Sequence, residues 1–342
     1  MSKVRPRISV VLPFRDAEDT LRESVDSILG QSEGDLELLA IDDGSSDSGP
    51  AIIQDLAISD SRIRFVATGG DGIVTALNLG LEKARAPCIA RMDADDVSHP
   101  NRLLLQLDFL DDHPEIGLVS SRVEHWTSDG ASRPGYAAYV NWTNQLLLSP
   151  DLARSRFVES PVAHPSVVFR KELVERLGGY RAGFFPEDYE MWLRWMEYGV
   201  LMEKLPEVLL RWRDHEERLS RRDERYSLDA FYQMKLGYLH RWLERHNPFH
   251  PVVKVWGAGR TTRGRVRFLE DEGTSIAGYY DLDPRKIGVP REGLTVRPIE
   301  EIPPPGLEFI VAMVGARGAR EKVSSFLKAR GYREGTDFML AA

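Results

Sequence analysis

Cys88-Ile-Ala-Arg-Met-Asp-Ala-Asp-Asp96 is a short apolar run that ends in three acidic side chains. A run of this kind, without alternating polar residues, is typical of a buried parallel strand. Carboxylates one residue apart at the end of a strand can face one hard cation, and Mg²⁺ or Mn²⁺ prefers oxygen ligands together with substrate phosphates. An isolated Asp-x-Asp is more often a solvated turn, so the neighbouring sequence has to separate the two interpretations.

Strand and helix patterns alternate before this cluster and predict a parallel sheet with helices on its faces. Asp42 and Asp43 end the second predicted strand, so two acid clusters would meet at the sheet edge where function collects in such folds. They repel each other unless a positive group, such as a bound metal–nucleotide, lies between them. The predicted strands are 8–13, 36–41, 63–66 and 88–92, and the helices lie around 21–29, 52–57 and 74–83.

The second half of the chain predicts a separate, smaller α/β module. The region 119–246 is less regular and rich in aromatic residues, and a long helix at 231–243 stops at His246-Asn247-Pro248. The strand pattern then restarts. We therefore predict a catalytic domain over residues 1–247 and a Rossmann-like accessory domain over 248–342, within the usual domain size range. Its predicted strands are 252–256, 276–280 and 309–314, with helices ending near 269 and over 321–329.

The Gly257-Ala-Gly259 turn partly resembles a dinucleotide-binding fingerprint, with Asp281 at the end of the next strand. The third glycine, Gly264, comes too late for that pattern. We favour a glycine turn that lets helix and strand pack closely over an NAD site. An intermediate interpretation is that this module binds a regulatory nucleotide or docks to a partner.

Composition and charge exclude several classes of protein. The 342 residues carry 45 basic and 53 acidic side chains, for a formal net charge of −8, which disfavours a general nucleic-acid binder. Cys88 is the single cysteine, so an internal disulfide is excluded. We predict no transmembrane segment and a cytoplasmic location, with peripheral attachment at a membrane surface left open. A homo-oligomer is also left open.

A second acidic feature opens a predicted helix at Pro186-Glu187-Asp188. Carboxylates are favoured beside the positive end of a helix, so these two acids have an ordinary structural explanation. The functional alternative is a general base, which needs a carboxylate close to the hydroxyl that it deprotonates.

The order of these features resembles family 2 glycosyltransferases with a GT-A fold. The resemblance rests on the segments 8–13, 41–45, 92–96, Pro100-x-Arg102-Leu103-x-x-Gln106 and Gly179-Tyr180 followed by Glu187-Asp188, and it spans about residues 6–220. The later segments Trp256-x-Ala258-Gly259 and Glu334-Gly-Thr-Asp-Phe338 further resemble the animal β-1,3-N-acetylglucosaminyltransferase-like proteins.

The resemblance implies a role for each matching residue. Asp42 or Asp43 would bind the nucleobase or ribose, and Asp93 the ribose side. Asp95, with Asp93 and with Asp96 in support, would hold Mn²⁺ or Mg²⁺, and His215 would be a late metal ligand or phosphate donor. Asp188 would be the base and Glu187 would orient acceptor or sugar, whereas His164 is more often structural. The remaining donor contacts would be Pro13, Phe14, Arg15, Asn78, Arg91 and Ala94.

The expected function is an inverting, metal-dependent transfer of a hexosyl or N-acetylhexosaminyl group in polysaccharide biosynthesis. A nucleotide-sugar, with a UDP-sugar favoured, would be the donor, and a saccharide or lipid-linked saccharide the acceptor. The alternatives are a nucleotide-sugar-binding regulatory protein and a nucleotidyltransferase, although Pro13-Phe14-Arg15-Asp16 lacks the glycine-rich basic loop of the latter. Arg15 and Leu77 depart from the family pattern, where asparagine and arginine are common, which leaves the nucleobase open.

Overall fold

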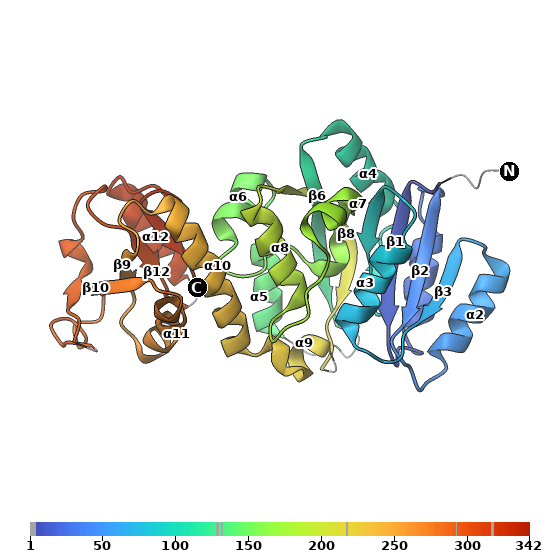
Figure 1. The fold of residues 1–342 in the computed structure, drawn as a ribbon, viewed down its shortest axis with the longest axis horizontal. Helices are drawn as coiled ribbons and strands as arrows, with labels where there is room; N and C mark the ends of the chain where they lie inside the picture. Colours follow the sequence, from blue (N-terminus) through green and yellow to red (C-terminus); the bar gives the residue numbers. More distant parts are fainter. Residues whose placement is uncertain (1–4, 128–129, 131–132, 217, 292, 316–317) are drawn as a thin grey trace. The chain divides into compact units, whose positions relative to one another are not determined.

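The computed structural model describes residues 5–127, 130, 133–216, 218–291, 293–315 and 318–342. The chain divides into two compact units, each built from more than one stretch of sequence (Figure 1). The predicted limit at residue 247 for the catalytic domain stays a prediction. Unit 1 comprises Met1–Leu152, Pro161–Gly183 and Glu187–Arg222, and unit 2 comprises Ala153–Ser160, Phe184–Pro186 and Asp223–Ala342.

Unit 1 begins with the predicted alternation of strands and helices and continues through a mixed region. Its first seven elements are β1 (Ile8–Phe14), α1 (Leu21–Leu29), β2 (Leu36–Asp42), α2 (Gly49–Ser59), β3 (Ile63–Ala67), α3 (Ile73–Lys83) and β4 (Cys88–Arg91). The region after β4 contains β5 (Val97–Ser98), α4 (Arg102–Asp112), β6 (Ile116–Trp126), α5 (Pro134–Thr143), α6 (Ser149–Ser155), the 3-10 helix η1 (His164–Ser166), β7 (Val168–Arg170), α7 (Lys171–Leu177), α8 (Glu187–Glu197), β8 (Leu201–Arg213) and α9 (Leu219–Arg222).

These strands form one eight-stranded sheet in the order β3-β2-β1-β4-β7-β6-β8-β5. The first four are parallel, as predicted, and their register pairs Phe14 with Asp42 and Val11 with Arg91. Beyond β4 the sheet is mixed, because β7 runs antiparallel to β4 and β6, and β5 runs antiparallel to β8. The carboxyl ends of β1, β2 and β4 therefore share one edge, and β8 pairs with the residues that follow β4 along the chain.

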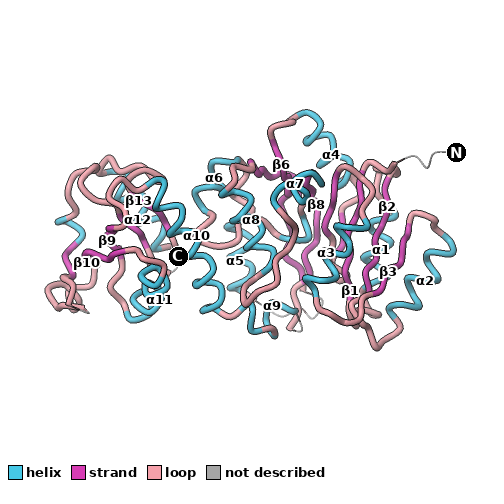
Figure 2. The backbone as a smooth tube through the Cα atoms, in the orientation of Figure 1, coloured by secondary structure: helices cyan, strands magenta, loops and turns pink. Residues whose placement is uncertain are grey.

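Helices cover both faces of this sheet, which gives unit 1 two apolar cores. Val10 and Leu12 of β1 pack in the core that receives α1 and α4, whereas Val11 packs in the core that receives α3 and α8. The tube in Figure 2 shows the strands of unit 1 side by side with helices along them. The continuous apolar runs of β1 and β2 follow from this burial on both faces.

Unit 2 contains a five-stranded parallel sheet in the order β11-β10-β9-β12-β13. The long helix α10 begins at Leu228, where the Ser227 hydroxyl accepts a hydrogen bond from the amide of Ala230 (3.3 Å). The elements are the 3-10 helix η2 (Glu224–Tyr226), α10 (Leu228–His246), β9 (Val252–Trp256), α11 (Arg260–Asp271), β10 (Ser275–Asp281), β11 (Val296–Pro298), the 3-10 helix η3 (Ile299–Glu301), β12 (Ile310–Ala312), α12 (Ala319–Ala329) and β13 (Phe338–Leu340).

The glycine turn between β9 and α11 serves close packing. Gly257 has a φ of 117°, and a Cβ there would lie 3.3 Å from Thr262 Oγ1 and 3.4 Å from the carbonyl oxygen of Met313. The carboxylate of Asp281 accepts a hydrogen bond from the amide of Ala258 (2.8 Å) and pairs with Lys286 (3.0 Å). This arrangement supports the interpretation of a packing turn. No helix among the described residues is long and apolar enough to cross a membrane.

Candidate functional site

Asp42 and Asp43 stand at the carboxyl end of β2 with defined hydrogen-bond partners. The carboxylate of Asp42 accepts a bond from the amide of Ser45 (2.9 Å), and that of Asp43 accepts bonds from the Thr68 hydroxyl (2.8 Å) and the Gly72 amide (3.0 Å). Gly44 has a φ of 76°, and a Cβ there would lie 2.9 Å from the Cα of Gly70. The loop after β2 is therefore closely packed, and both acids are buried against it.

The predicted donor contacts around β1 lie in different environments. Pro13 and Phe14 belong to buried β1, at the register position beside the end of β2. The side chain of Arg15 is 59% exposed just beyond the strand. Asn78 of α3 uses both ends of its amide on the backbone of Tyr180, with bonds of 2.9 Å and 3.0 Å. This clamp joins α3 to the Tyr180 segment, and the donor-contact role of Asn78 stays a prediction.

Asp93, Asp95 and Asp96 come together after β4, with ligand atoms within 4.8 Å of one another. Asp93 forms an ion pair with buried Arg91, and, against the desolvation of this guanidinium, the charges of Asp93 and Asp96 both act to raise its pKa. The carbonyl of Ala94 accepts a bond from Thr20 (3.0 Å), and that of Asp93 accepts one from Ser24 (2.8 Å). Helix α1 therefore fixes the backbone that presents the three carboxylates.

Asp95 and Asp96 differ in burial and in charge state. The side chain of Asp95 is 26% exposed and lies 2.8 Å from Nε2 of His215, which immediately follows the β8 region. Desolvation raises the pKa of Asp95, but the bond to His215 and the charge of Arg218 outweigh it and hold this pKa below its usual value. Asp96 is 1% exposed, and desolvation together with the charges of Asp95 and Asp93 raises its pKa well above the usual range. Asp95 is thus the ionised member that can hold a cation.

Two arginines, Arg213 at the end of β8 and Arg218 beyond it, complete this environment, and the sequence did not single out Arg218. The Asp96 carboxylate accepts the backbone amide of Arg213 (2.8 Å), and Arg213 Nε donates to the carbonyl of Asp95 (2.6 Å). The guanidinium of Arg218 bonds to the hydroxyl of Tyr136, and the fields of Tyr136 and the three aspartates raise its pKa although desolvation lowers it. Arginine placement beyond an irregular loop has no periodic signal in the sequence. Asp95 and Asp96 are therefore held between α1 and the residues after β8.

A buried polar network supports the end of β4 from below. Arg102 of α4 is fully buried, and its guanidinium donates to the carbonyl of Arg91 (2.8 Å) and to Gln106 (3.1 Å). Desolvation lowers the pKa of Arg102 to about 9, against the opposing charge of Asp96. Gln106 in turn donates to the carbonyls of Ser166 (2.8 Å) and Val119 (3.1 Å). These residues of the Pro100-x-Arg102-Leu103-x-x-Gln106 segment therefore position the acids.

Glu187 and Asp188 occupy the first turn of α8, as predicted. Desolvation, followed by the charge of Glu187, raises the pKa of Asp188 to about 7. The field of Arg91 acts in the opposite direction on Asp188, and the same guanidinium is paired with Asp93. The base candidate and the metal-binding candidates thus share one electrostatic neighbourhood. A carboxyl with a pKa near neutrality can both accept and release a proton at physiological pH.

His164, which the sequence analysis interprets as more often structural than catalytic, is buried and bonded to Tyr180. It lies 9% exposed in η1, with Nε2 2.8 Å from the hydroxyl of Tyr180 and its ring against Trp192. Desolvation and the charge of Arg91 lower its pKa well below the usual value, so the ring is neutral. This contact holds Tyr180, the residue that Asn78 also clamps.

Sequence comparisons place these residues in a known family. The pattern described as "Glycosyl transferase family 2" matches residues 9–178. EpsE of Bacillus subtilis (strain 168) is 31% identical over 66% of this chain and 79% of that protein. The UDP-Gal:alpha-D-GlcNAc-diphosphoundecaprenol beta-1,3-galactosyltransferase of Escherichia coli is 29% identical over 65% of this chain and 79% of that protein. AmsE, the amylovoran biosynthesis glycosyltransferase of Erwinia amylovora, is 34% identical to this chain over a match that covers 44% of this chain and 54% of that protein.

A solved structure shows the same fold. The crystal structure of S. aureus TarS 1-349 in complex with UDP-GlcNAc has a TM-score of 0.56 and 15% identity, covering 78% of this chain and 80% of that chain. The shared architecture is the GT-A fold that the resemblance implied. With the family pattern over residues 9–178 and the match to 79% of EpsE, the chain belongs to glycosyl transferase family 2 and is a glycosyltransferase.

Proposed function

We propose that the protein transfers a hexosyl or N-acetylhexosaminyl group from a nucleotide-sugar to a saccharide hydroxyl, with inversion and with a divalent cation. The observation that carries this proposal is the grouping of Asp93, Asp95 and Asp96 within 4.8 Å at the end of β4. The set offers only carboxylate oxygens, with His215 adjacent to Asp95, and such oxygens suit Mg²⁺ or Mn²⁺. The acids fit the cation because Asp95 is ionised and partly exposed.

In this proposal Asp95, with Asp93 and with His215 close by, holds the cation. When bound, the cation neutralises charge that develops on the departing nucleoside diphosphate. Either Asp42 or Asp43, both buried, contacts the nucleobase or ribose, beside Pro13 and Phe14 at the same sheet edge. Arg91 and Ala94 flank the donor, and Arg15, exposed beyond β1 and 3.9 Å from the carboxylate of Asp16, approaches it from solvent. Arg218, whose charge already acts on Asp95, adds a positive field that favours a diphosphate.

Asp188 accepts the proton of the acceptor hydroxyl as that oxygen attacks the anomeric carbon. One displacement from the face opposite the leaving group inverts the anomeric configuration. Glu187 orients the acceptor or the sugar and, through its charge, keeps the pKa of Asp188 high enough for efficient proton transfer. Tyr180, fixed by His164 and Asn78, lies in the same electrostatic neighbourhood and contributes to its shape.

The relatives narrow the substrate class. One is named for transfer from UDP-Gal to alpha-D-GlcNAc-diphosphoundecaprenol, and another for amylovoran biosynthesis. We infer a UDP-sugar donor, a saccharide or lipid-linked saccharide acceptor and a role in polysaccharide biosynthesis. A cytoplasmic location at the membrane surface fits such an acceptor. The finer resemblance to the animal β-1,3-N-acetylglucosaminyltransferase-like proteins rests on segments at 256–259 and 334–338 of unit 2 and stays a prediction.

A calorimetric titration of nucleotide-sugars into the full chain tests this function. We expect one UDP-sugar to bind in the presence of Mn²⁺, and Asp95→Ala to weaken binding at least tenfold because the cation loses its ionised ligand. Asp111→Asn, at an exposed acid 65% accessible on α4, is the matched control and should leave binding unchanged. NMR of the product then gives its anomeric configuration.

Three results would argue against the proposal. Retention of configuration would contradict the single displacement. Equal donor affinity with and without a divalent cation would contradict a role for the metal in donor binding. Donor binding without transfer to any saccharide acceptor would instead favour a regulatory nucleotide-sugar-binding protein.

A further inference from the structure

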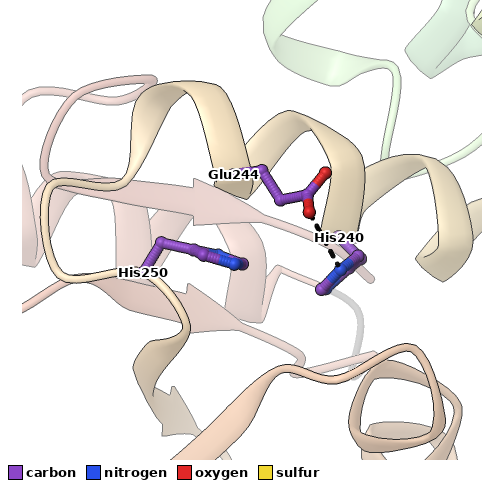
Figure 3. A group of neighbouring side chains, drawn as sticks. All are labelled: His240, Glu244 and His250. Carbon is purple, nitrogen blue, oxygen red and sulfur yellow. Dashed lines mark ion pairs between the residues drawn. The ribbon is translucent and has the colours of Figure 1, made fainter.

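Unit 2 carries a second group of metal-ligating side chains, separate in sequence and chemistry from the aspartates of unit 1. His240, Glu244 and His250 each place a ligand atom within 4.8 Å of the others. Figure 3 shows His240 and Glu244 extending from α10, with the ring of His250 directed toward them from the segment that follows. Two imidazoles and one carboxylate form a donor set that the transferase chemistry of unit 1 does not use.

The backbone holds these three residues in place. His240 and Glu244 are four residues apart and so lie on one face of α10. His250 comes after a turn in which the Asn247 side chain bonds to the amide of Phe249 (2.9 Å) and to the carbonyl of Val252 (2.9 Å). The amide of His250 also donates to the carbonyl of Asn247 (3.0 Å). The turn thus returns the chain to α10 in a fixed geometry.

The hydroxyl of Thr274 orients the ring of His240. Thr274 is buried, and its Oγ1 lies 2.8 Å from His240 Nδ1. When Nδ1–H donates to this oxygen, the lone pair of Nε2 faces Glu244 Oε1 at 3.7 Å. That separation is too long for a hydrogen bond. A hydrogen-bonded outer nitrogen is the arrangement that metal-ligating histidines have in proteins.

His250 supplies an independent indication of a missing ligand. Its Nδ1 is buried and has no hydrogen-bond partner among the residues that the structure describes. A buried nitrogen without a partner is destabilising. A cation between the three side chains would give this histidine a partner and would separate the lone pair of His240 from the carboxylate.

We propose that His240, Glu244 and His250 bind a first-row transition metal of the Zn²⁺ class. Imidazole nitrogens favour Zn²⁺ over Mg²⁺, whereas the all-carboxylate set of unit 1 has the opposite preference. A tetrahedral ion with bonds of about 2.0–2.1 Å needs ligand atoms about 3.3 Å apart. The His240–Glu244 distance of 3.7 Å is close to this value, and because all three ligand atoms lie within 4.8 Å of one another, side-chain rotation has to close at most about 1.5 Å.

The ion has an entry path and a defined consequence. The Glu244 side chain is 50% exposed, so solvent reaches the carboxylate, and a water completes the fourth position. Because His250 directly precedes the Pro251–Val252 entry into β9, the ion ties the end of α10 to the start of the parallel sheet. The site is structural, and it lies outside the transfer chemistry.

The test is a Zn²⁺ titration of the chelator-stripped full chain, followed by calorimetry. The background is the double variant Asp95→Asn, His215→Gln, which removes two of the competing ligands of unit 1, the ionised carboxylate and the imidazole. We expect one Zn²⁺ to bind, and His240→Gln or His250→Gln to weaken the Kd at least tenfold. His246→Gln is the matched control, since His246 ends the same helix, is exposed, and contacts Trp242 through its carbonyl (2.7 Å) and by stacking on its ring, away from the three proposed ligands. It should leave the Kd unchanged.

A second measurement separates loss of a ligand from loss of the fold. Co²⁺ bound in place of Zn²⁺ should show the visible spectrum of a tetrahedral nitrogen–oxygen site, and this spectrum should vanish in His240→Gln while circular dichroism stays that of the parent. The proposal is overturned by Zn²⁺ affinity that His240→Gln and His250→Gln leave within twofold, or by binding that disappears with the Asp95 and His215 changes alone. No heat of binding at millimolar Zn²⁺ would overturn it as well.

Discussion

Asp188 is the single residue whose charge sets the pH range of the proposed reaction. Its pKa, raised to about 7 by desolvation and by Glu187, is well above that of an exposed aspartate. Only the ionised carboxylate accepts a proton from the acceptor. We therefore predict that kcat/KM falls tenfold per pH unit below about pH 7 and reaches a plateau above it, since kcat/KM reports the groups of the free enzyme. A pH–rate profile measures this directly.

Asp188→Asn should lower kcat by at least about 10²–10⁴-fold and leave the donor Kd nearly unchanged. The pKa of Asp188 is higher in the folded protein than in the unfolded chain, so the free energy of unfolding falls as the pH rises toward 7 and the carboxyl ionises. Asparagine carries no charge, so Asp188→Asn should not lower Tm. Asp60→Asn is the control. The bond to Arg62 holds the pKa of Asp60 below its usual value, so this carboxyl does not titrate in the pH range around 7 where the rate is expected to change. If the residual kcat/KM of Asp188→Asn still falls tenfold per pH unit below about pH 7, Asp188 is not the general base.

Some residues of the candidate site were predictable from the sequence and others were not. Asp42, Asp93 and Asp95 were predicted because strand ends are readable from apolar runs and parallel strands share an edge. Arg218 and Tyr136 were not, since their meeting depends on how an irregular loop after β8 packs beside α5. Asn78 was assigned to the donor from the family pattern, while the structure shows its amide bonded to the backbone of Tyr180.

Among the elements of unit 1, the pairing of α3 with β1 is unusually close. Gly80 lies in the middle of α3, and a Cβ there would be 2.4 Å from Cγ1 of Val11. Gly80→Ala gains helix propensity of about 1 kcal/mol but overpacks a stiff β-branched neighbour, which costs about 1–3 kcal/mol. We predict a net loss of up to about 2 kcal/mol, or a Tm lower by up to about 8 °C for a unit of this size. Differential scanning calorimetry provides the measurement.

Two further variants test the cause. Gly34→Ala, where a Cβ would meet nothing within 4 Å, should leave Tm unchanged or slightly higher. In a Val11→Ala background, Gly80→Ala should become stabilising, because the clashing methyl group is gone. A Gly80→Ala loss that is the same in both backgrounds would place the strain elsewhere.

Element types were predictable where the period of the apolar residues was clear. The first four strands and α3, α10 and α11 follow such patterns, and the structure confirms them within a few residues. The region between β5 and β8 was harder, because β6 and β7 pair antiparallel and β6 carries the buried Ser120 and Ser121 among its apolar residues. Strand β13 is only three residues long and has too little pattern to be found.

For the whole molecule, the two units predict a localised response to substrate. All the residues proposed to bind the donor, and those proposed to hold Mn²⁺ with it, lie in unit 1. We expect a UDP-sugar with Mn²⁺ at 100 times its Kd to slow amide exchange in unit 1 up to about 100-fold, equivalent to about 2.7 kcal/mol. Peptides covering residues 12–16, 42–47, 91–96 and 213–215 should respond first, as measured by hydrogen-exchange mass spectrometry.

The matched comparison lies within the same experiment. Peptides from β9 to β10 in unit 2, which include the Gly257 turn, should exchange at unchanged rates with donor and Mn²⁺. Protection confined to the Gly257 turn would instead indicate a nucleotide at the second sheet and would contradict the packing-turn interpretation.

The interrupted sequence of unit 2 has a consequence for synthesis on the ribosome. Residues 153–160 are made more than sixty residues before the long continuous stretch of unit 2 begins at Asp223. Their partners arrive late: the carbonyl of Val158 accepts a bond from Lys235 (3.1 Å), and the ring of Phe157 packs edge-on against Trp242 (6.1 Å between centroids). A nascent chain that has just completed Arg222 thus exposes Phe157 and Val158 until α10 emerges. Chaperone binding during translation should concentrate in that interval.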